Sequence, residues 1–146
     1  MEVRIRHSKD HRAEAVARCH RVVCDQPVEE GGSDLGMTPP ELFLASLGCC
    51  AMHYAADYMR ARRLALEDIE LRVSAVKGSR PARLVEIEIS VDAPGLSSKV
   101  RAGLTKAIEA CLLDRTLANP PRVKVSMTTL VKEGPPSVPQ PVDLAS

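Results

Sequence analysis

Aromatic side chains are nearly absent from this sequence of 146 residues, which contains no tryptophan, one phenylalanine and two tyrosines. Proteins that bind single-stranded nucleic acids stack the bases on aromatic rings, so the composition argues against such binding. A net charge of one sign is also lacking, because 20 basic and 19 acidic side chains leave a formal charge of +1. This balance supplies no field that would attract nucleic acid or an anionic membrane. The sequence therefore predicts neither of these partners.

Long hydrophobic runs and an export signal are missing as well. The longest mostly apolar stretch, residues 42–52, is much shorter than the ~20 residues that a membrane-spanning helix needs. The first seven residues alternate charged and apolar side chains and contain no apolar signal region. The five cysteines include no Cys-x-x-Cys pair. An odd number of cysteines without an export signal fits a reducing compartment, so we expect a cytoplasmic protein whose disulfides are transient.

The composition that remains is that of a globular protein, with 45% apolar residues. A chain of this length can bury roughly 70% of the surface that its unfolded form exposes, so one domain suffices. We expect that domain to cover residues 1–132. Residues 133–146 contain four prolines and few apolar residues, and we expect this tail to be disordered.

The first third of the sequence predicts two short strands, a loop and a long helix. The strands are expected at 1–6 and 15–24, and the loop, rich in glycine and proline, at 25–37. Thr38-Pro39-Pro40-Glu41 is a typical helix start, with a capping threonine, prolines in the first turn and a glutamate that can close a capping box. The helix can continue to about Leu64, which corresponds to roughly 40 Å. Its first half is apolar on nearly every side, which favours a central position in the fold.

The remaining sequence predicts a hairpin, a second helix and a last strand. Residues 69–75 and 85–92 alternate apolar and polar side chains, and 78–81 supplies the turn between them. A helix capped by Ser97 or Ser98 should end at Asn119-Pro120-Pro121, before a strand at 123–127. Its apolar stripe consists of Val100, Leu104, Ala107, Ile108, Cys111 and Leu112. The predicted fold class is α+β, with an antiparallel sheet packed against the helices.

Cys50 and Cys111 are the candidate catalytic residues, because each lies on the inward side of a different predicted helix. A peroxide-reducing site needs an attacking thiolate and commonly a second thiol that resolves the sulfenic acid. For Cys50 alone, a role as a small buried core residue is about equally consistent with the sequence. Cys49 points about 100° away from Cys50 on a helix, and we expect it to be a core residue. Cys19 and Cys24 are expected on opposite faces of one strand, as structural thiols.

Cys50 lies beyond the first helical turn, so a nearby cation or donor would have to stabilise its thiolate. His53 is one candidate, although a hydrogen-bonded interior histidine explains it equally simply. Arg115 is another, although a cation near a helix C-terminus is favoured by the helix dipole. Glu41 could orient an arginine, but the capping box already accounts for it. The glycine at position 48 suggests a close backbone approach between two helices.

A metal site built on Cys49 and His53, which share a helix face, is disfavoured because two ligands are too few for zinc. No bound metal or cofactor is therefore expected.

Two segments resemble the OsmC/Ohr family. The first is the glycine-rich loop and helix of residues 31–50, with Pro39-Pro40-Glu41-Leu42 leading to Cys50; the second is Cys111-Leu112-Leu113-Asp114-Arg115-Thr116-Leu117. The resemblance extends over roughly residues 15–130 in the same order of elements. It implies an intertwined homodimer with the long helices at its centre and active sites formed between subunits. It also implies that Cys50 is the peroxidatic cysteine, that Cys111 resolves it, and that an external thiol or dithiol reduces the disulfide.

The sequence departs from the organic hydroperoxide resistance branch of this family at one position. Alignment on Cys50 places Pro40 where that branch has a glutamate that holds the activating arginine, and Glu41 follows one position later. Arg18 and Arg21 lie in the region expected for the arginine, and no motif selects between them. The leading hypothesis is a homodimeric thiol-dependent peroxidase that reduces small organic hydroperoxides. The alternative is a non-enzymatic dimer that binds an apolar or thiol-bearing ligand.

Overall fold

The computed structural model describes residues 1–67 and 69–127, which form two compact units. The first unit contains Met1–Pro39 and residues 123–127, and the second contains Pro40–Arg122. The predicted domain over 1–132 remains a prediction, and the predicted disordered tail at 133–146 lies outside the described residues. Among the helices of the described ranges, none combines the length and the hydropathy that a bilayer crossing requires.

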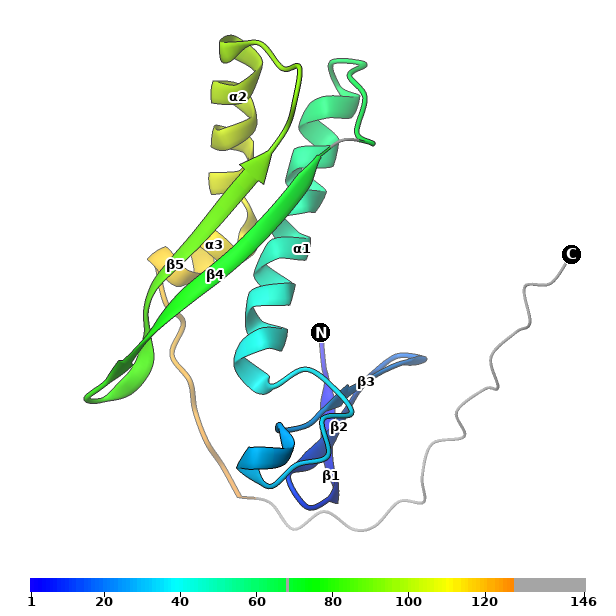
Figure 1. Cartoon of the computed structure of the whole chain (residues 1–146), viewed down its shortest axis with the longest axis vertical. Coiled ribbons are helices and arrows are strands. Elements are labelled where there is room, and N and C mark those ends of the chain that lie inside the picture. The colour runs from blue at the N-terminus through cyan, green and yellow to red at the C-terminus, as the bar shows by residue number, and fades with distance from the viewer. Residues whose placement is uncertain (68, 128–146) are drawn as a thin grey trace, which may run out of the picture. The chain divides into compact units, whose positions relative to one another are not determined.

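A three-stranded antiparallel sheet makes up most of the first unit (Figure 1). Its strands are β1 (Arg4–Lys9), β2 (Arg12–Ala17) and β3 (His20–Cys24), in that spatial order. The single strand predicted at 15–24 is wrong, because a turn at Arg18 and Cys19 divides it. Arg18 adopts a left-handed conformation with φ of 56°, which reverses the chain. Cys19 is consequently exposed in a turn and does not share a strand with Cys24.

The loop predicted at 25–37 is confirmed, and it contains one short 3₁₀ helix, η1 (Val28–Glu30). The loop is organised around Asp25, whose side chain is 1% exposed. The Asp25 carboxylate accepts hydrogen bonds from the backbone N–H groups of Gln26, Ser33 and Leu35 and lies 3.8 Å from Arg12 Nε. Burial acts to raise the pKa of Asp25, but these donors and the Arg12 charge outweigh it, so the pKa is lowered.

The long helix α1 (Pro39–Arg60) begins where the capping signals predict. It ends four residues before the predicted Leu64. Arg63 adopts a left-handed conformation with φ of 54°, and the N–H of Leu64 donates to the carbonyl of Met59. This hydrogen bond is typical of a helix C-terminus and explains the earlier end.

The predicted hairpin is confirmed as β4 (Glu70–Ser79) and β5 (Ala82–Asp92), which form a separate two-stranded antiparallel sheet. Residues 80–81 connect the strands, and the apolar residues of the two alternating patterns pair across them, for example Val73 with Ile89. Gly48 of α1 approaches this hairpin, because a Cβ at Gly48 would lie 2.9 Å from Val73 Cγ2. The close approach expected at this glycine is made by a side chain of strand β4, and an approach between two helices stays a prediction.

The single helix predicted up to Asn119 is wrong, because two helices occupy this region. They are α2 (Ser98–Glu109), which the Ser97 hydroxyl caps, and α3 (Leu112–Ala118), which ends before the Asn-Pro-Pro sequence as expected. The break at Cys111 changes the direction of the following residues, and Leu112 is 59% exposed instead of lying on the inward stripe. The strand predicted at 123–127 is also wrong, because these residues are exposed and pair with no strand in the described ranges.

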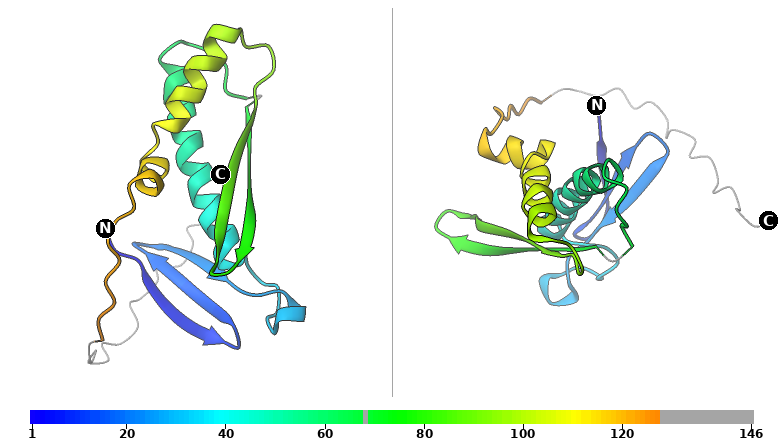
Figure 2. Two further views of the ribbon diagram at one scale, coloured as in Figure 1. Left: turned by 90° about the vertical axis from the view of Figure 1, so that its left-hand side faces the viewer. Right: turned by 90° about the horizontal axis from the view of Figure 1, so that it is seen from above.

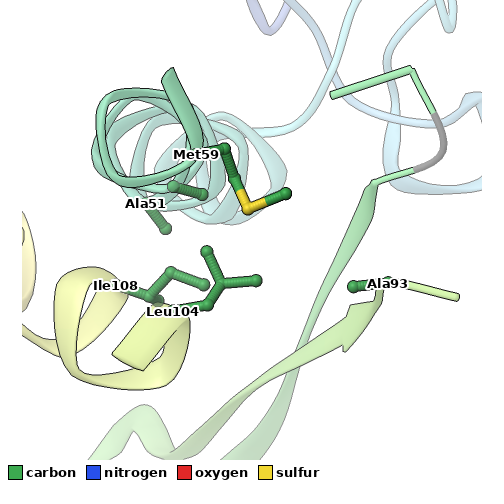
Figure 3. Close-up of a cluster of buried hydrophobic side chains, with 6 residues drawn as sticks. Ala51, Met59, Ala93, Leu104 and Ile108 are labelled. Carbon is green, nitrogen blue, oxygen red and sulfur yellow. The ribbon is translucent and has the colours of Figure 1, made fainter. Parts of the chain in front are cut away.

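The core of the second unit lies between α1, α2 and the end of β5 (Figure 3). In Figures 1 and 2, α2 lies beside the C-terminal half of α1. Helix α1 buries one residue on each successive turn, and α2 contributes two more buried side chains. The buried residues are Leu47, Ala51, Ala55, Met59, Ala93, Leu104, Ile108 and Cys111. The α+β class is thus confirmed, with two antiparallel sheets and three α-helices in the described residues.

Candidate functional site

The structure brings Cys50 and Cys111 together within the second unit. Cys50 lies in the middle of α1, and Cys111 lies at the junction of α2 and α3. Their side chains share a hydrogen bond. Cys111 is completely buried, whereas Cys50 is half-buried. Two thiols in contact on separate helices, one of them reached by solvent, can form a disulfide when one sulfur is oxidised.

The environment of Cys111 keeps its thiol protonated. Burial raises the pKa of Cys111, and the hydrogen bond and charge of Cys50 raise it further. The backbone N–H of Asp114, 3.3 Å from the sulfur, and that of Leu113 act in the opposite direction without outweighing these effects. The Cys111 S–H group is therefore available to donate a hydrogen bond to the Cys50 sulfur.

Local backbone geometry explains why Cys111 is buried. Cys111 is the N-cap residue of α3, with an extended backbone at φ of −65° and ψ of 151°, and its sulfur accepts a hydrogen bond from the Asp114 N–H. A capping residue turns its side chain back over the first helical turn. No sequence signal marks the N–H donors of Leu113 and Asp114, because cysteine is not among the usual capping residues.

A cavity of about 870 Å³ lies between β5 and the helices α2 and α3, with one residue of α1 in its lining. Leu47 lines it one turn before Cys50, and Ile108 lines it three residues before Cys111. Five apolar side chains of β5 also line it, and its charged residues are Glu86, Glu109 and Asp114. Neither sulfur belongs to the described lining. The cavity has the volume to hold a small molecule with both apolar and polar groups.

The other candidates in the second unit are more exposed. The His53 side chain is 69% exposed and its Nε2 lies 3.5 Å from the Asp57 carboxylate, so the alternative of an interior histidine is wrong. Arg115 is exposed, and its charge is not among the causes that shift the pKa of Cys111. Glu41 lies exposed in the first turn of α1.

Cys49 is exposed, and the prediction that it is a core residue is therefore wrong. The exposed position follows from the helix, since the buried stripe of α1 passes through residues 47, 51 and 55 and leaves position 49 on the opposite side. Within the described residues, no group of three or more potential ligands could hold a metal ion.

Arg18 and Arg21 belong to the first unit. Arg18 lies in the turn between β2 and β3. Arg21 is exposed in β3 and forms an ion pair of 3.5 Å with Glu14 on the neighbouring strand. The role of either arginine in activating Cys50 therefore stays a prediction.

Two comparisons with known proteins found matches. A family model described as OsmC-like protein matches residues 31–126. No curated protein matches the chain.

Several solved structures are similar to the whole fold. An OsmC-like protein from Mycoplasma pneumoniae is 16% identical, with a TM-score of 0.68 over 82% of this chain and 87% of that protein. An organic hydroperoxide resistance protein from Legionella pneumophila is 18% identical, with a TM-score of 0.59 over 80% and 87% of the two chains. The organic hydroperoxide resistance protein OhrB of Bacillus subtilis is 17% identical, with a TM-score of 0.56 over 82% and 90%. At these identities the similarity establishes the fold alone.

Proposed function

The chain belongs to the OsmC-like protein family, and from this premise we propose that it is a thiol-dependent peroxidase that reduces organic hydroperoxides through Cys50 and Cys111. The observation that carries the proposal is the direct interaction of the two thiols. Structurally similar proteins from Legionella pneumophila and Bacillus subtilis are described as organic hydroperoxide resistance proteins, which supports the choice of substrate class.

The difference in burial assigns the two roles. Cys50 is the more accessible thiol, so its thiolate attacks the distal oxygen of the hydroperoxide. The O–O bond breaks, the alkoxide takes a proton and leaves as the alcohol, and Cys50 becomes a sulfenic acid. Cys111 holds its proton until this point, because its raised pKa and the hydrogen bond to Cys50 both favour the thiol. Its sulfur then attacks the sulfenic sulfur, and water leaves as the disulfide forms.

An external thiol or dithiol completes the cycle by exchange with the Cys50–Cys111 disulfide. The reductant is oxidised to its own disulfide and both protein thiols are restored. The cavity that Leu47 and Ile108 help to line is large enough for the organic substituent of a hydroperoxide. The proposed cycle uses only the two protein thiols, the hydroperoxide and the external reductant, without a metal or a cofactor.

We further propose that the protein acts as a homodimer in the cytoplasm. Apolar residues on its hairpin, Val76 and Val85, are 53% and 49% exposed, and Ile5 of β1 is 63% exposed. A second copy that covered such side chains would remove them from water. Light scattering coupled to size-exclusion chromatography tests this directly, and a mass of one chain at micromolar concentration would contradict it.

The peroxidase proposal is tested with purified protein, cumene hydroperoxide and dithiothreitol. The wild-type protein is expected to consume the hydroperoxide, and Cys50→Ser is expected to abolish turnover. In the absence of dithiothreitol, Cys111→Ser should consume one equivalent of hydroperoxide and stop with a sulfenic acid on Cys50, which a dimedone adduct identifies by mass spectrometry. Cys49→Ser is the matched control, because it removes an adjacent but exposed thiol and should retain activity. Absence of turnover with organic hydroperoxides would overturn the proposal.

The cavity also favours a second candidate, a non-enzymatic dimer that binds an apolar or thiol-bearing ligand. The cavity is present while the cysteines are reduced. In addition, Pro40 stands where the organic hydroperoxide resistance branch has a glutamate that holds the activating arginine. In this case Cys50→Ser would leave ligand binding intact. A thermal-shift screen of small apolar thiols against the wild type and Cys50→Ser distinguishes the two functions.

A further inference from the structure

A second cavity, of about 380 Å³, lies between the end of α1 and helix α2, on residues that the thiol chemistry does not use. Its lining contains three cations and no acidic side chain. The residues that define it are Tyr58, Arg62, Lys99, Val100, Gly103 and Lys106. A concave site with charge of one sign is typical of a binding site for a small ligand of the opposite charge.

Helix geometry aligns the lysines along this cavity. Lys99 and Lys106 are seven residues apart, so they lie two turns apart on one face of α2, separated by about 10 Å along the helix axis. Gly103 lies between them on the same face. A Cβ at Gly103 would overlap the Tyr58 hydroxyl, so the missing side chain allows the tyrosine to lie against the helix. The Tyr58 hydroxyl therefore takes the place of a side chain at residue 103, between the two lysines.

Arg62 is held in place on the opposite side of the cavity. Its guanidinium lies 3.6 Å from the centroid of the Tyr58 ring, and its Nη1 donates to the Tyr58 carbonyl. These contacts fix the planar group while leaving most of its five N–H donors for another acceptor. A stacked and immobilised arginine loses little further freedom when it binds an anion.

The three cations of this cavity have no obvious role in stabilising the fold. Lys99 lies in the first turn of α2, where the helix dipole disfavours a cation, and that turn contains no acidic residue. Within residues 1–67 and 69–127, none of the three cations forms an ion pair with a carboxylate. All three cations are exposed to water, and a bound anion would give them a counter-charge at close range.

We propose that this cavity binds the phosphate group or groups of a soluble, phosphorylated small molecule. Lys99, Lys106 and Arg62 contact the phosphate oxygens, and Val100 and the ring of Tyr58 contact the less polar part of the ligand. The volume suits a small molecule, and the shortage of exposed aromatic rings argues against a nucleic acid strand. This site is independent of Cys50 and Cys111.

Isothermal titration calorimetry of the reduced full-length protein with inorganic pyrophosphate tests the proposal. Saturable binding is expected, weakened by added salt. Lys99→Glu should weaken binding at least about tenfold, and Lys106→Gln should weaken it less. The exchange at Lys99 is compatible with folding, because the first turn of a helix favours an acidic residue. Lys77→Glu is the matched control, with the same charge change on the exposed surface of β4.

Three results would overturn the proposal. These are the absence of saturable pyrophosphate binding, retention of full affinity in Lys99→Glu, and equal weakening by Lys77→Glu, which would indicate a general charge effect. Lipid headgroups present the same phosphate chemistry, so vesicles of phosphatidylcholine containing phosphatidic acid form a second arm. Co-sedimentation with these vesicles that Lys99→Glu abolishes, without pyrophosphate binding, would assign the site to a membrane and also overturn the proposal.

Discussion

The packing of α2 against α1 holds Cys111 beside Cys50, so weakening that contact provides a quantitative test of the structure. Leu104 is 2% exposed and packs among Ala51, Ala55 and Met59. Replacement of a buried leucine by alanine typically costs about 2–5 kcal/mol, from lost burial and from the cavity left behind. The alanines and the flexible methionine around it allow partial collapse, so we expect Leu104→Ala to lower the free energy of unfolding by about 3 kcal/mol.

Urea denaturation followed by circular dichroism measures this change at a fixed protein concentration, because any dimer would make stability depend on concentration. With a denaturant slope of about 2 kcal/mol per molar urea, the midpoint should fall by about 1.5 M. Leu112→Ala is the matched control, since Leu112 is 59% exposed and its loss should change stability by no more than about 0.5 kcal/mol. Similar losses for both variants would refute the described packing of α2.

Three further predictions concern positions with specific contacts. Gly48→Ala improves helix propensity by about 1 kcal/mol but forces a Cβ to within 2.9 Å of Val73 Cγ2, so we expect net destabilisation that Val73→Ala relieves in a double-mutant cycle. If the changes in the free energy of unfolding caused by the two substitutions were additive, the predicted clash would be contradicted. The lowered pKa of Asp25 gives stability that is present above its ordinary pKa and lost as pH falls below about 4. Asp25→Asn should therefore destabilise the protein at neutral pH and make its stability depend less on pH in the acid range. Parallel curves of stability against pH for the wild type and the variant would contradict a stabilising role of the Asp25 carboxylate. Iodoacetamide should alkylate exposed Cys49 faster than Cys111, whose pKa is raised by burial; equal rates by mass spectrometry would contradict the burial of Cys111.

Elements with local signals were predictable from the sequence. The start of α1 follows from the threonine, prolines and glutamate around position 38, which act within one helical turn. The β4–β5 hairpin follows from two alternating patterns joined by a short polar turn. The place of Cys50 on α1 follows from helical periodicity, whereas Cys111 is buried through its capping position between α2 and α3.

Features that depend on distant partners were not predictable. The break at Cys111 has no glycine or proline to mark it, and it exists because a cysteine caps α3 while its sulfur meets α1. Residues 123–127 alternate like a strand, but alternation does not supply a pairing partner. Asp25 looked like an ordinary loop residue, because its backbone donors, Ser33 and Leu35, lie eight and ten positions further along the chain.

The most direct test of the account is to map the disulfide formed by one equivalent of hydroperoxide. The fully reduced wild-type protein is treated with equimolar cumene hydroperoxide, quenched with an alkylating agent, digested and analysed by mass spectrometry. The account predicts one dominant crosslink between the peptides that contain Cys50 and Cys111, formed as cumyl alcohol is released in equal amount. Persistence of both thiols in the reduced form, or a crosslink that joins Cys50 to any other cysteine, would contradict the central role of this pair.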